Sequence, residues 1–209
     1  MPVPSLADQY SGYPRQERTL RFGMWVFLAS ESLLFAGLFA LYAAYRSMYT
    51  VDFDDAVRHN TLVYGTVNTY ILLSSSFTVA LSVWATRRTR PRLAVGLLLT
   101  TAALGAAFLV LKMVEYREHW RTGALPGPFY HWVEHPTFGA NRFFTVYWLM
   151  TGLHALHVTA GLVILAWLAW RAHRRHYTAA HHTTLEMGTL YWHLIDVVWI
   201  FLWPILYLA

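Results

Sequence analysis

The stretch GTLYWHLIDVVWIFLWPILYL, from Gly188 to Leu208, decides the fold of this chain. It is long and apolar enough to cross a membrane as a helix, since a span needs roughly 20 apolar residues. It nevertheless carries His193 and Asp196, which lie three positions apart and therefore on one helix face. An ionisable side chain in a span normally faces protein or water, because facing lipid is costly. The stretch therefore predicts a membrane helix with one polar side turned toward a partner.

The composition of the whole chain agrees with this interpretation. Of its 209 residues, 56% are apolar and only 13% are charged, which is typical of an integral membrane protein. The absence of cysteine excludes disulfides, thiolate metal sites, iron–sulfur clusters and haem attachment through a CxxCH motif. The net charge of +5 is spread over short basic clusters between apolar runs, so it does not indicate a nucleic-acid partner.

The apolar runs predict an all-α membrane protein, a bundle of five transmembrane helices. We expect a cytoplasmic tail at 1–21 and one transmembrane domain at 22–209, with the connecting segments read as loops. Gly and Pro between 123 and 128 mark the third loop as irregular. The expected spans are 22–45, 66–85, 93–113, 143–170 and 188–208.

The distribution of charge predicts the orientation. The tail and the second and fourth loops hold ten arginines and three carboxylates. The first and third loops hold six cations and six carboxylates, if Lys112 and Glu115 are counted with the third loop. Because the cytoplasmic side carries the excess of Lys and Arg, we expect the amino terminus inside the cell and the carboxy terminus outside.

Ionisable residues from three expected spans fall in one layer of the membrane at about 1.5 Å of rise per residue. A carboxylate at that depth must take a proton or find a partner, so we expect Glu31 to be hydrogen-bonded to a histidine of the fourth span. The estimated depth slightly favours His154 over His157. The layer comprises Glu31, His154, His157, His193 and Asp196.

Three interpretations of this layer compete. The favoured one is a structural polar core, in which the groups satisfy one another and fix helix packing. The second is a metal or haem site, with His157 and His193 as a bis-His haem pair; no Glu-x-x-His repeat supports a di-metal bundle. The third is a proton path. A small transporter is a weaker hypothesis, since neither inverted repeats nor broken helices are visible.

Small residues in two spans predict close helix packing. The run NTYILLSSSFTVALS in the second span gives a hydroxyl-rich face. Gly152 and Gly161 in the fourth span are expected packing points.

Four motifs together carry a family likeness. They are GMWVFLASESLLFAGLFA at 23–40, KMVEY at 112–116, TGLHALHVTAGL at 151–162 and HHTTLEMGTLYWHLIDVVWIFL at 181–202. In this order and spacing they resemble subunit III of the haem–copper oxidases, the cytochrome c oxidase subunit 3 family, in its short five-helix form. The resemblance covers essentially the whole chain from Gly23 onward.

The resemblance implies a subunit without haem or copper of its own. Such a subunit packs on oxidase subunit I, with other oxidase subunits or a respiratory supercomplex as further partners, and binds phospholipid. It supports proton uptake and stability during turnover in the bacterial cytoplasmic membrane. No catalytic, cofactor-binding or metal residue is expected, and His157 becomes the favoured partner of Glu31. The implied buried network comprises Glu31, Glu115, His154, His157, Glu186, His193 and Asp196, and candidate lipid contacts are Trp25, Arg46, Arg171 and Trp199.

Two alternatives stay open. The chain could serve a quinol oxidase or a nitric oxide reductase system rather than a cytochrome c oxidase. From another class, it could be a self-contained haem- or metal-binding membrane enzyme that uses His154, His157 and His193.

Overall fold

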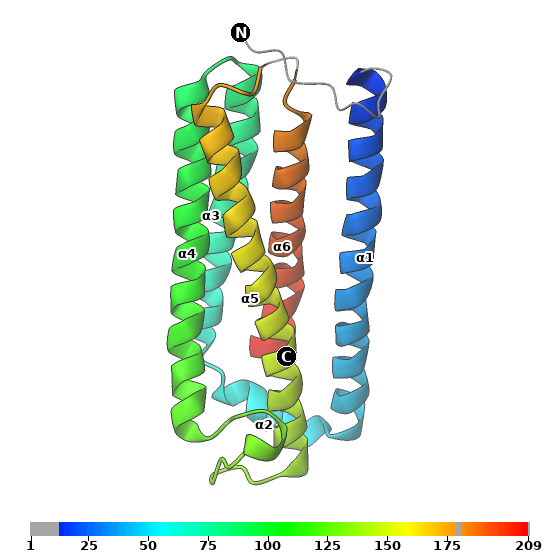
Figure 1. Cartoon of the computed structure of the whole chain (residues 1–209). Coiled ribbons are helices and arrows are strands. Elements are labelled where there is room, and N and C mark those ends of the chain that lie inside the picture. Colours follow the sequence, from blue (N-terminus) through cyan, green and yellow to red (C-terminus); the bar gives the residue numbers. More distant parts are fainter. Residues whose placement is uncertain (1–12, 179–180, 209) are drawn as a thin grey trace.

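The computed structural model describes residues 13–178 and 181–208. Five long helices run up and down in one bundle (Figure 1). Each is long and apolar enough to span a membrane, as the sequence predicted. They are α1 (Tyr13–Met48), α3 (Leu62–Arg87), α4 (Pro91–Thr122), α5 (Phe138–His173) and α6 (Thr183–Tyr207).

The helices extend beyond the apolar runs that predicted them. Helix α1 begins at Tyr13, so part of the expected tail is helical. Local signals set several ends: Pro91 occupies the first turn of α4, and Gly123, with φ of 83°, ends it in the left-handed conformation. The side chain of Thr137 caps α5 by accepting a hydrogen bond from the Ala140 amide at 3.2 Å.

The segment expected as the first loop contains a further helix, α2 (Thr50–His59). Phe53, Ala56 and Val57 are buried and lie on one helix face, so α2 packs under the bundle as an amphipathic element. The side-chain amide of Asn60 then donates to the Leu206 carbonyl at 2.8 Å. This bond satisfies one of the last carbonyls of α6, which have no partner within the helix. A short 3-10 turn, η1 (Gly127–Phe129), lies in the third loop.

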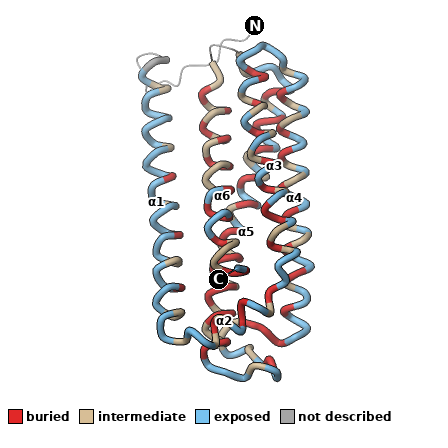
Figure 2. Tube along the Cα trace, turned by 180° about the vertical axis from the view of Figure 1, so that it is seen from behind, coloured by how far each residue is buried: buried red, intermediate tan, exposed pale blue. Residues whose placement is uncertain are grey.

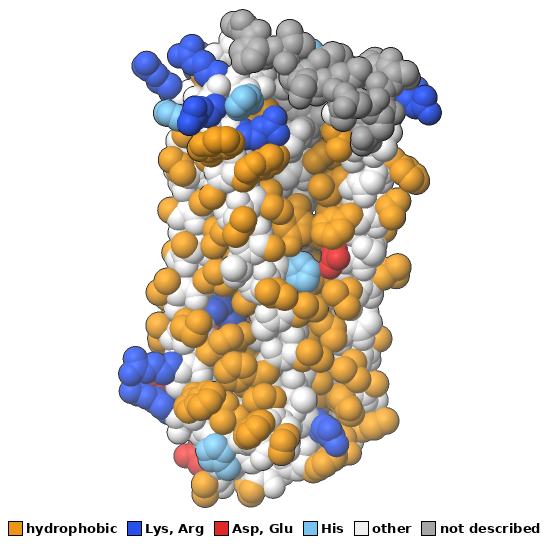
Figure 3. Space-filling model, in the orientation of Figure 1, with side chains coloured by type: hydrophobic (Ala, Val, Ile, Leu, Met, Phe, Trp, Pro, Cys, Tyr) orange, Lys and Arg blue, Asp and Glu red, His pale blue; other side chains and the backbone are white. Residues whose placement is uncertain are grey.

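Helix α6 lies at the centre of the bundle and α1 lies at its edge. Helix α6 contacts α3 and α5 extensively, while α1 touches α5 and α6 more sparsely. Figure 2 shows the difference as a mostly exposed α1 beside a largely buried α6. Hydrophobic side chains dominate the middle of the face seen in Figure 3, and basic side chains gather toward the two ends.

Candidate functional site

The clearest polar contact inside the apolar bundle joins α1 to α5. Nε2 of His157 lies 2.9 Å from Oε2 of Glu31, near the midpoint of α1. This is the pairing that the family resemblance favoured, whereas the depth estimate alone slightly favoured His154. The two side chains are only partly buried, with 13% and 18% of their surfaces exposed. The pair therefore lies at the groove between α1 and α5 rather than deep in the core.

The second nitrogen of His157 determines where the protons of this pair lie. Nδ1 is 2.8 Å from the Leu153 carbonyl oxygen, which can only accept, so Nδ1 must carry a hydrogen. A hydrogen bond between Nε2 and Glu31 then needs one more proton, held by either the carboxyl or the ring. In both arrangements the pair has no net charge, which suits its depth in an apolar span.

The other members of the predicted layer do not join this pair. His193 Nδ1 lies 2.7 Å from the Ser76 hydroxyl on α3. His154 is 1% exposed and packs between the rings of Phe108 and Trp199, at centroid distances of 5.5 and 5.2 Å. Asp196 is 3% exposed, and the Ser76 hydroxyl that contacts His193 also lies beside its carboxylate. Among the described residues the layer therefore divides into separate contacts, because its side chains face different neighbouring helices.

The hydroxyl-rich face of α3 accepts hydrogen bonds from tryptophans of α6. The Trp192 indole N–H donates to Ser75 Oγ at 2.9 Å, and the Trp199 indole N–H donates to Thr69 Oγ1 at 3.0 Å. Trp199 is fully buried, so its prediction as a lipid contact was wrong. It lies on the side of α6 that faces α3 and α4.

Glu115 belongs to a separate, buried ion pair, and its pairing with Lys112 was not predicted from the sequence. Nζ of Lys112 donates to Glu115 Oε2 at 3.0 Å, and both residues are 2% exposed. The hydroxyls of Tyr147 and Tyr207 donate to Oε1 of the same carboxylate at 2.7 and 2.5 Å. Both charges were counted as loop charges, yet they lie inside α4. The i, i+3 spacing in KMVEY was the available signal.

Glu186 lies at the opposite end of the bundle from this ion pair. It lies near the start of α6 and accepts hydrogen bonds from Arg21 at 3.2 Å and Arg87 at 2.6 Å. His182 Nε2 lies 3.0 Å from the same carboxylate. This cluster links α1, α3 and α6 at the surface, so Glu186 is not part of a mid-membrane network.

The remaining candidate lipid contacts lie near the ends of the spans or on the outside of α1. Trp25 is 63% exposed on α1. Arg46 donates to Asp54 at 3.1 Å, and the Arg171 guanidinium lies 4.9 Å from the centre of the Trp167 ring. Such arginines, held by a neighbouring ring or carboxylate, are well placed at a membrane interface.

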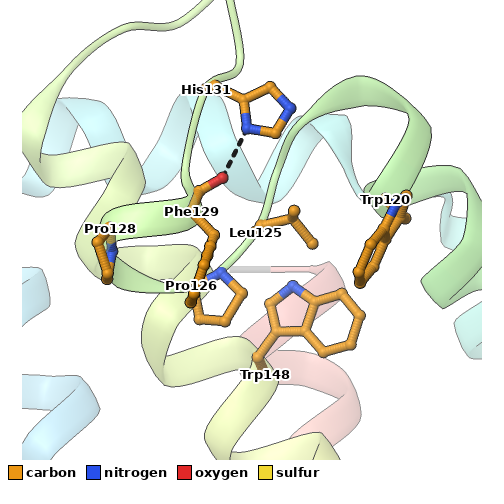
Figure 4. A pocket seen from close by; sticks show the side chains of 7 residues that line it. All are labelled: Trp120, Leu125, Pro126, Pro128, Phe129, His131 and Trp148. Atoms are coloured by element: carbon orange, nitrogen blue, oxygen red, sulfur yellow. Dashed lines mark hydrogen bonds between the residues drawn. The ribbon is translucent and has the colours of Figure 1, made fainter.

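The connection between α4 and α5 forms an aromatic hollow of about 670 Å³ (Figure 4). The Trp148 indole N–H donates to the Ala124 carbonyl at 2.9 Å, which fixes one wall. Nearby, His59 of α2 packs against Trp132 at 4.2 Å, and burial lowers the pKa of His59, so its neutral ring is favoured. The lining residues of the hollow are Trp120, Leu125, Pro126, Pro128, Phe129, His131 and Trp148.

Comparison with known proteins identifies the family of the chain. The family model described as cytochrome c oxidase subunit III matches residues 9–209. The chain belongs to the cytochrome c oxidase subunit III family. The cytochrome c oxidase subunit 3 of Thermostichus vulcanus is 36% identical, over 89% of this chain and 85% of the relative. That of Synechocystis sp. is 34% identical, over 99% of this chain and 81% of the relative. The cytochrome bo(3) ubiquinol oxidase subunit 3 of Pseudomonas aeruginosa is 32% identical, over 90% of this chain and 83% of the relative.

Family membership and geometry bear together on the hypothesis of a metal enzyme. Within residues 13–178 and 181–208, no group of three or more His, Cys, Asp or Glu side chains is arranged to hold a metal ion. The histidines named for a bis-His haem point apart, since His157 contacts Glu31 and His193 contacts Ser76. The described geometry therefore favours a structural use of these side chains.

Proposed function

We propose that this chain is subunit III of a bacterial haem–copper oxidase and that it carries no redox centre of its own. The family match over residues 9–209 carries the proposal. The oxidase would contain haem and copper in partner subunits, with subunit I the principal contact of this chain. Relatives named as cytochrome c oxidase subunits, at 36% and 34% identity, support a cytochrome c oxidase as the complex, with a quinol oxidase, named for a relative at 32%, as the alternative.

We further propose that the end of the bundle where α1, α4 and α6 begin faces the cytoplasm. The ten arginines of the tail and of the second and fourth loops support this orientation. The charges of the opposite side still sum to zero when the buried Lys112–Glu115 pair is excluded, because the pair contributes one cation and one carboxylate. The carboxy terminus then lies on the periplasmic side.

The proposed role of the Glu31–His157 pair is to hold α1 against α5 during turnover. Helix α1 has few other polar ties to the bundle, and its exposed apolar face suits lipid or a partner subunit. Because the pair holds no redox group, its loss should leave electron transfer intact while weakening subunit retention and durability. Support of proton uptake and binding of phospholipid complete the proposed role.

Purification in mild detergent through a tag on this chain tests the assignment. We expect haem- and copper-containing subunits to co-purify, and we expect no stoichiometric metal after this chain is separated from them. Glu31→Ala should give a normal initial rate of oxygen reduction and a faster loss of activity over successive turnovers. A chain that purifies alone with bound haem or iron would instead establish the self-contained enzyme. A variant without electron transfer despite normal assembly would contradict the structural role of Glu31.

A further inference from the structure

A basic hollow lies between the start of α4 and the end of α5, away from the polar groups described above. Its volume is about 320 Å³. Two guanidinium groups and an imidazole contribute to its rim, and small apolar side chains contribute to its walls. The lining residues are Pro91, Arg92, Val95, Ala172, His173 and Arg175.

The two arginines of this hollow are not neutralised within the chain. In the part of the chain that the structure describes, neither the Arg92 nor the Arg175 guanidinium group forms a hydrogen bond or an ion pair. Other arginines of the same end have fixed neighbours: Arg87 is bound by Glu186, and Arg174 lies 5.6 Å from the centre of the Trp170 ring. Two neighbouring cations without a counter-charge form a site for an anion.

The backbone holds Arg175 at the hollow rather than leaving it in a free loop. Its φ is 56°, in the left-handed region, which is uncommon for a residue other than glycine. The Arg175 amide donates to the Ala172 carbonyl at 3.0 Å, and the following amide, of His176, donates to the Arg171 carbonyl at 3.1 Å. The turn that closes α5 therefore fixes where the Arg175 side chain begins.

A second hollow at the other end of the bundle provides an internal comparison. It has a volume of about 470 Å³ and includes Arg46 and Arg58, but it also includes Asp54, which binds Arg46 at 3.1 Å. A carboxylate in the lining opposes the entry of an anion. No carboxylate lines the hollow of Arg92 and Arg175.

We propose that the hollow of Arg92, His173 and Arg175 binds the phosphate group of an anionic phospholipid. This inference rests on the proposed orientation, which places the hollow at the cytoplasmic leaflet, where basic pockets between membrane helices bind anionic headgroups. The two guanidinium groups pair with the phosphate, and the amino-terminal end of the long helix α4 adds a favourable dipole. Leu93, which follows Arg92 in the sequence, is exposed and offers apolar contact to the lipid chains.

The test compares two double variants of the intact oxidase that remove the same charge from the same end of the bundle. Arg92→Gln with Arg175→Gln removes the hollow, while Arg88→Gln with Arg174→Gln removes two exposed arginines that lie over tryptophans outside it. The complexes are placed in nanodiscs of phosphatidylcholine with a small fraction of phosphatidylglycerol. Native mass spectrometry then counts the phosphatidylglycerol molecules that remain bound.

We expect wild type and the Arg88/Arg174 variant to retain one phosphatidylglycerol more than the Arg92/Arg175 variant. The affinity of the Arg92/Arg175 variant for phosphatidylglycerol should fall about thirty-fold, because each arginine at a membrane surface contributes roughly five-fold. Equal retention in all three would overturn the proposal. Retention lost in wild type when low-millimolar inorganic phosphate is added would assign the hollow to free phosphate instead of lipid. If the double variant fails to assemble, the two single variants carry the test, with a five-fold loss expected in each. None of these outcomes depends on the electron donor or on the role of Glu31.

Discussion

Helices α1 and α6 have similar lengths of apolar sequence and opposite places in the molecule. In the most apolar stretch of α6, 50% of the residues are buried inside the chain, against 11% in α1. The buried side of α6 carries tryptophans whose indole N–H groups find hydroxyls on α3. The outer side of α1 carries large apolar groups such as Phe22, Trp25 and Leu33, all more than 60% exposed. Apolar composition therefore predicts a span, but it does not predict which span is central.

The difference extends to how each helix is attached. Helix α6 is fixed by close packing, since Trp192 fills space that Gly105 of α4 and Gly161 of α5 leave open. Helix α1 is fixed by a few separate contacts along its length, among them the Glu31–His157 pair and the bond from the Tyr42 hydroxyl to the Ile205 carbonyl at 2.8 Å. Substitutions around α6 should therefore affect the whole bundle, and substitutions on α1 should affect its attachment.

The largest effect is expected at the buried ion pair beside α6. Glu115→Ala should lower the free energy of unfolding by about 3–5 kcal/mol, because it leaves the Lys112 ammonium buried without its carboxylate. The matched control is Glu118→Ala on the same helix, whose carboxylate is exposed and 3.5 Å from Arg121. That change should cost less than about 1 kcal/mol. Thermal unfolding of the complex in detergent measures both, and equal midpoints would show that the pair is dispensable.

A smaller loss is expected where Trp192 packs against glycine. A Cβ at Gly105 would lie 2.5 Å from the Trp192 ring, and one at Gly161 would lie 2.8 Å from it. Either Gly→Ala variant should cost about 1–3 kcal/mol through overpacking. Gly152→Ala is the control, because nothing lies within 4 Å of its added Cβ. Unfolding midpoints that order the three variants differently would contradict the central role of Trp192.

The contrast between Gly161 and Gly152 also shows what the sequence could predict. Both were expected to be packing points, and within the described part of this chain only Gly161 packs closely against another helix. The five spans followed from apolar length alone and are confirmed. Helix α2 was missed although Phe53, Ala56 and Val57 have helical spacing, because every segment between the long apolar runs was interpreted as a loop. Detecting α2 required recognising the helical spacing of three apolar residues in a short segment, rather than a long apolar run.

The direction in which a side chain faces was the least predictable property. Trp199 was expected at lipid and is buried, although it lies three positions after Asp196 and therefore on the side of α6 that was expected to face a partner. The pair of Lys112 and Glu115 depends on hydroxyls from Tyr147 and Tyr207, which are distant in sequence. Local spacing can propose that two charges pair, but only the packed bundle brings the tyrosines to them. Glu31 was predictable because a lone mid-span carboxylate needs a partner.

On α1, the contact between Glu31 and His157 should contribute less than the buried ion pair. A double-mutant cycle with Glu31→Ala and His157→Ala should give a coupling energy of about 1–2 kcal/mol, as expected for a partly buried hydrogen bond between two ionisable groups that share one proton. Retention of this chain in the detergent-solubilised complex, measured against time, gives the readout. Additive losses would mean that the two side chains act independently and that α1 is held by other contacts.

The smallest effect is expected for Tyr42→Phe, which removes one neutral hydrogen bond between α1 and α6. Tyr42 is 4% exposed, and its ring packs edge-on against Phe53 at 5.4 Å, so phenylalanine keeps the packing. The loss should be about 1 kcal/mol, because the Ile205 carbonyl at the end of α6 is left without the hydroxyl. Tyr70→Phe is the control, since that ring is 68% exposed on α3. The retention assay used for Glu31 gives the readout. If Tyr42→Phe loses the subunit faster and Tyr70→Phe does not, α1 is held by separate contacts along its length. Full retention would leave the Glu31–His157 pair and the Arg21–Glu186 ion pair as the polar contacts that hold α1 to the bundle.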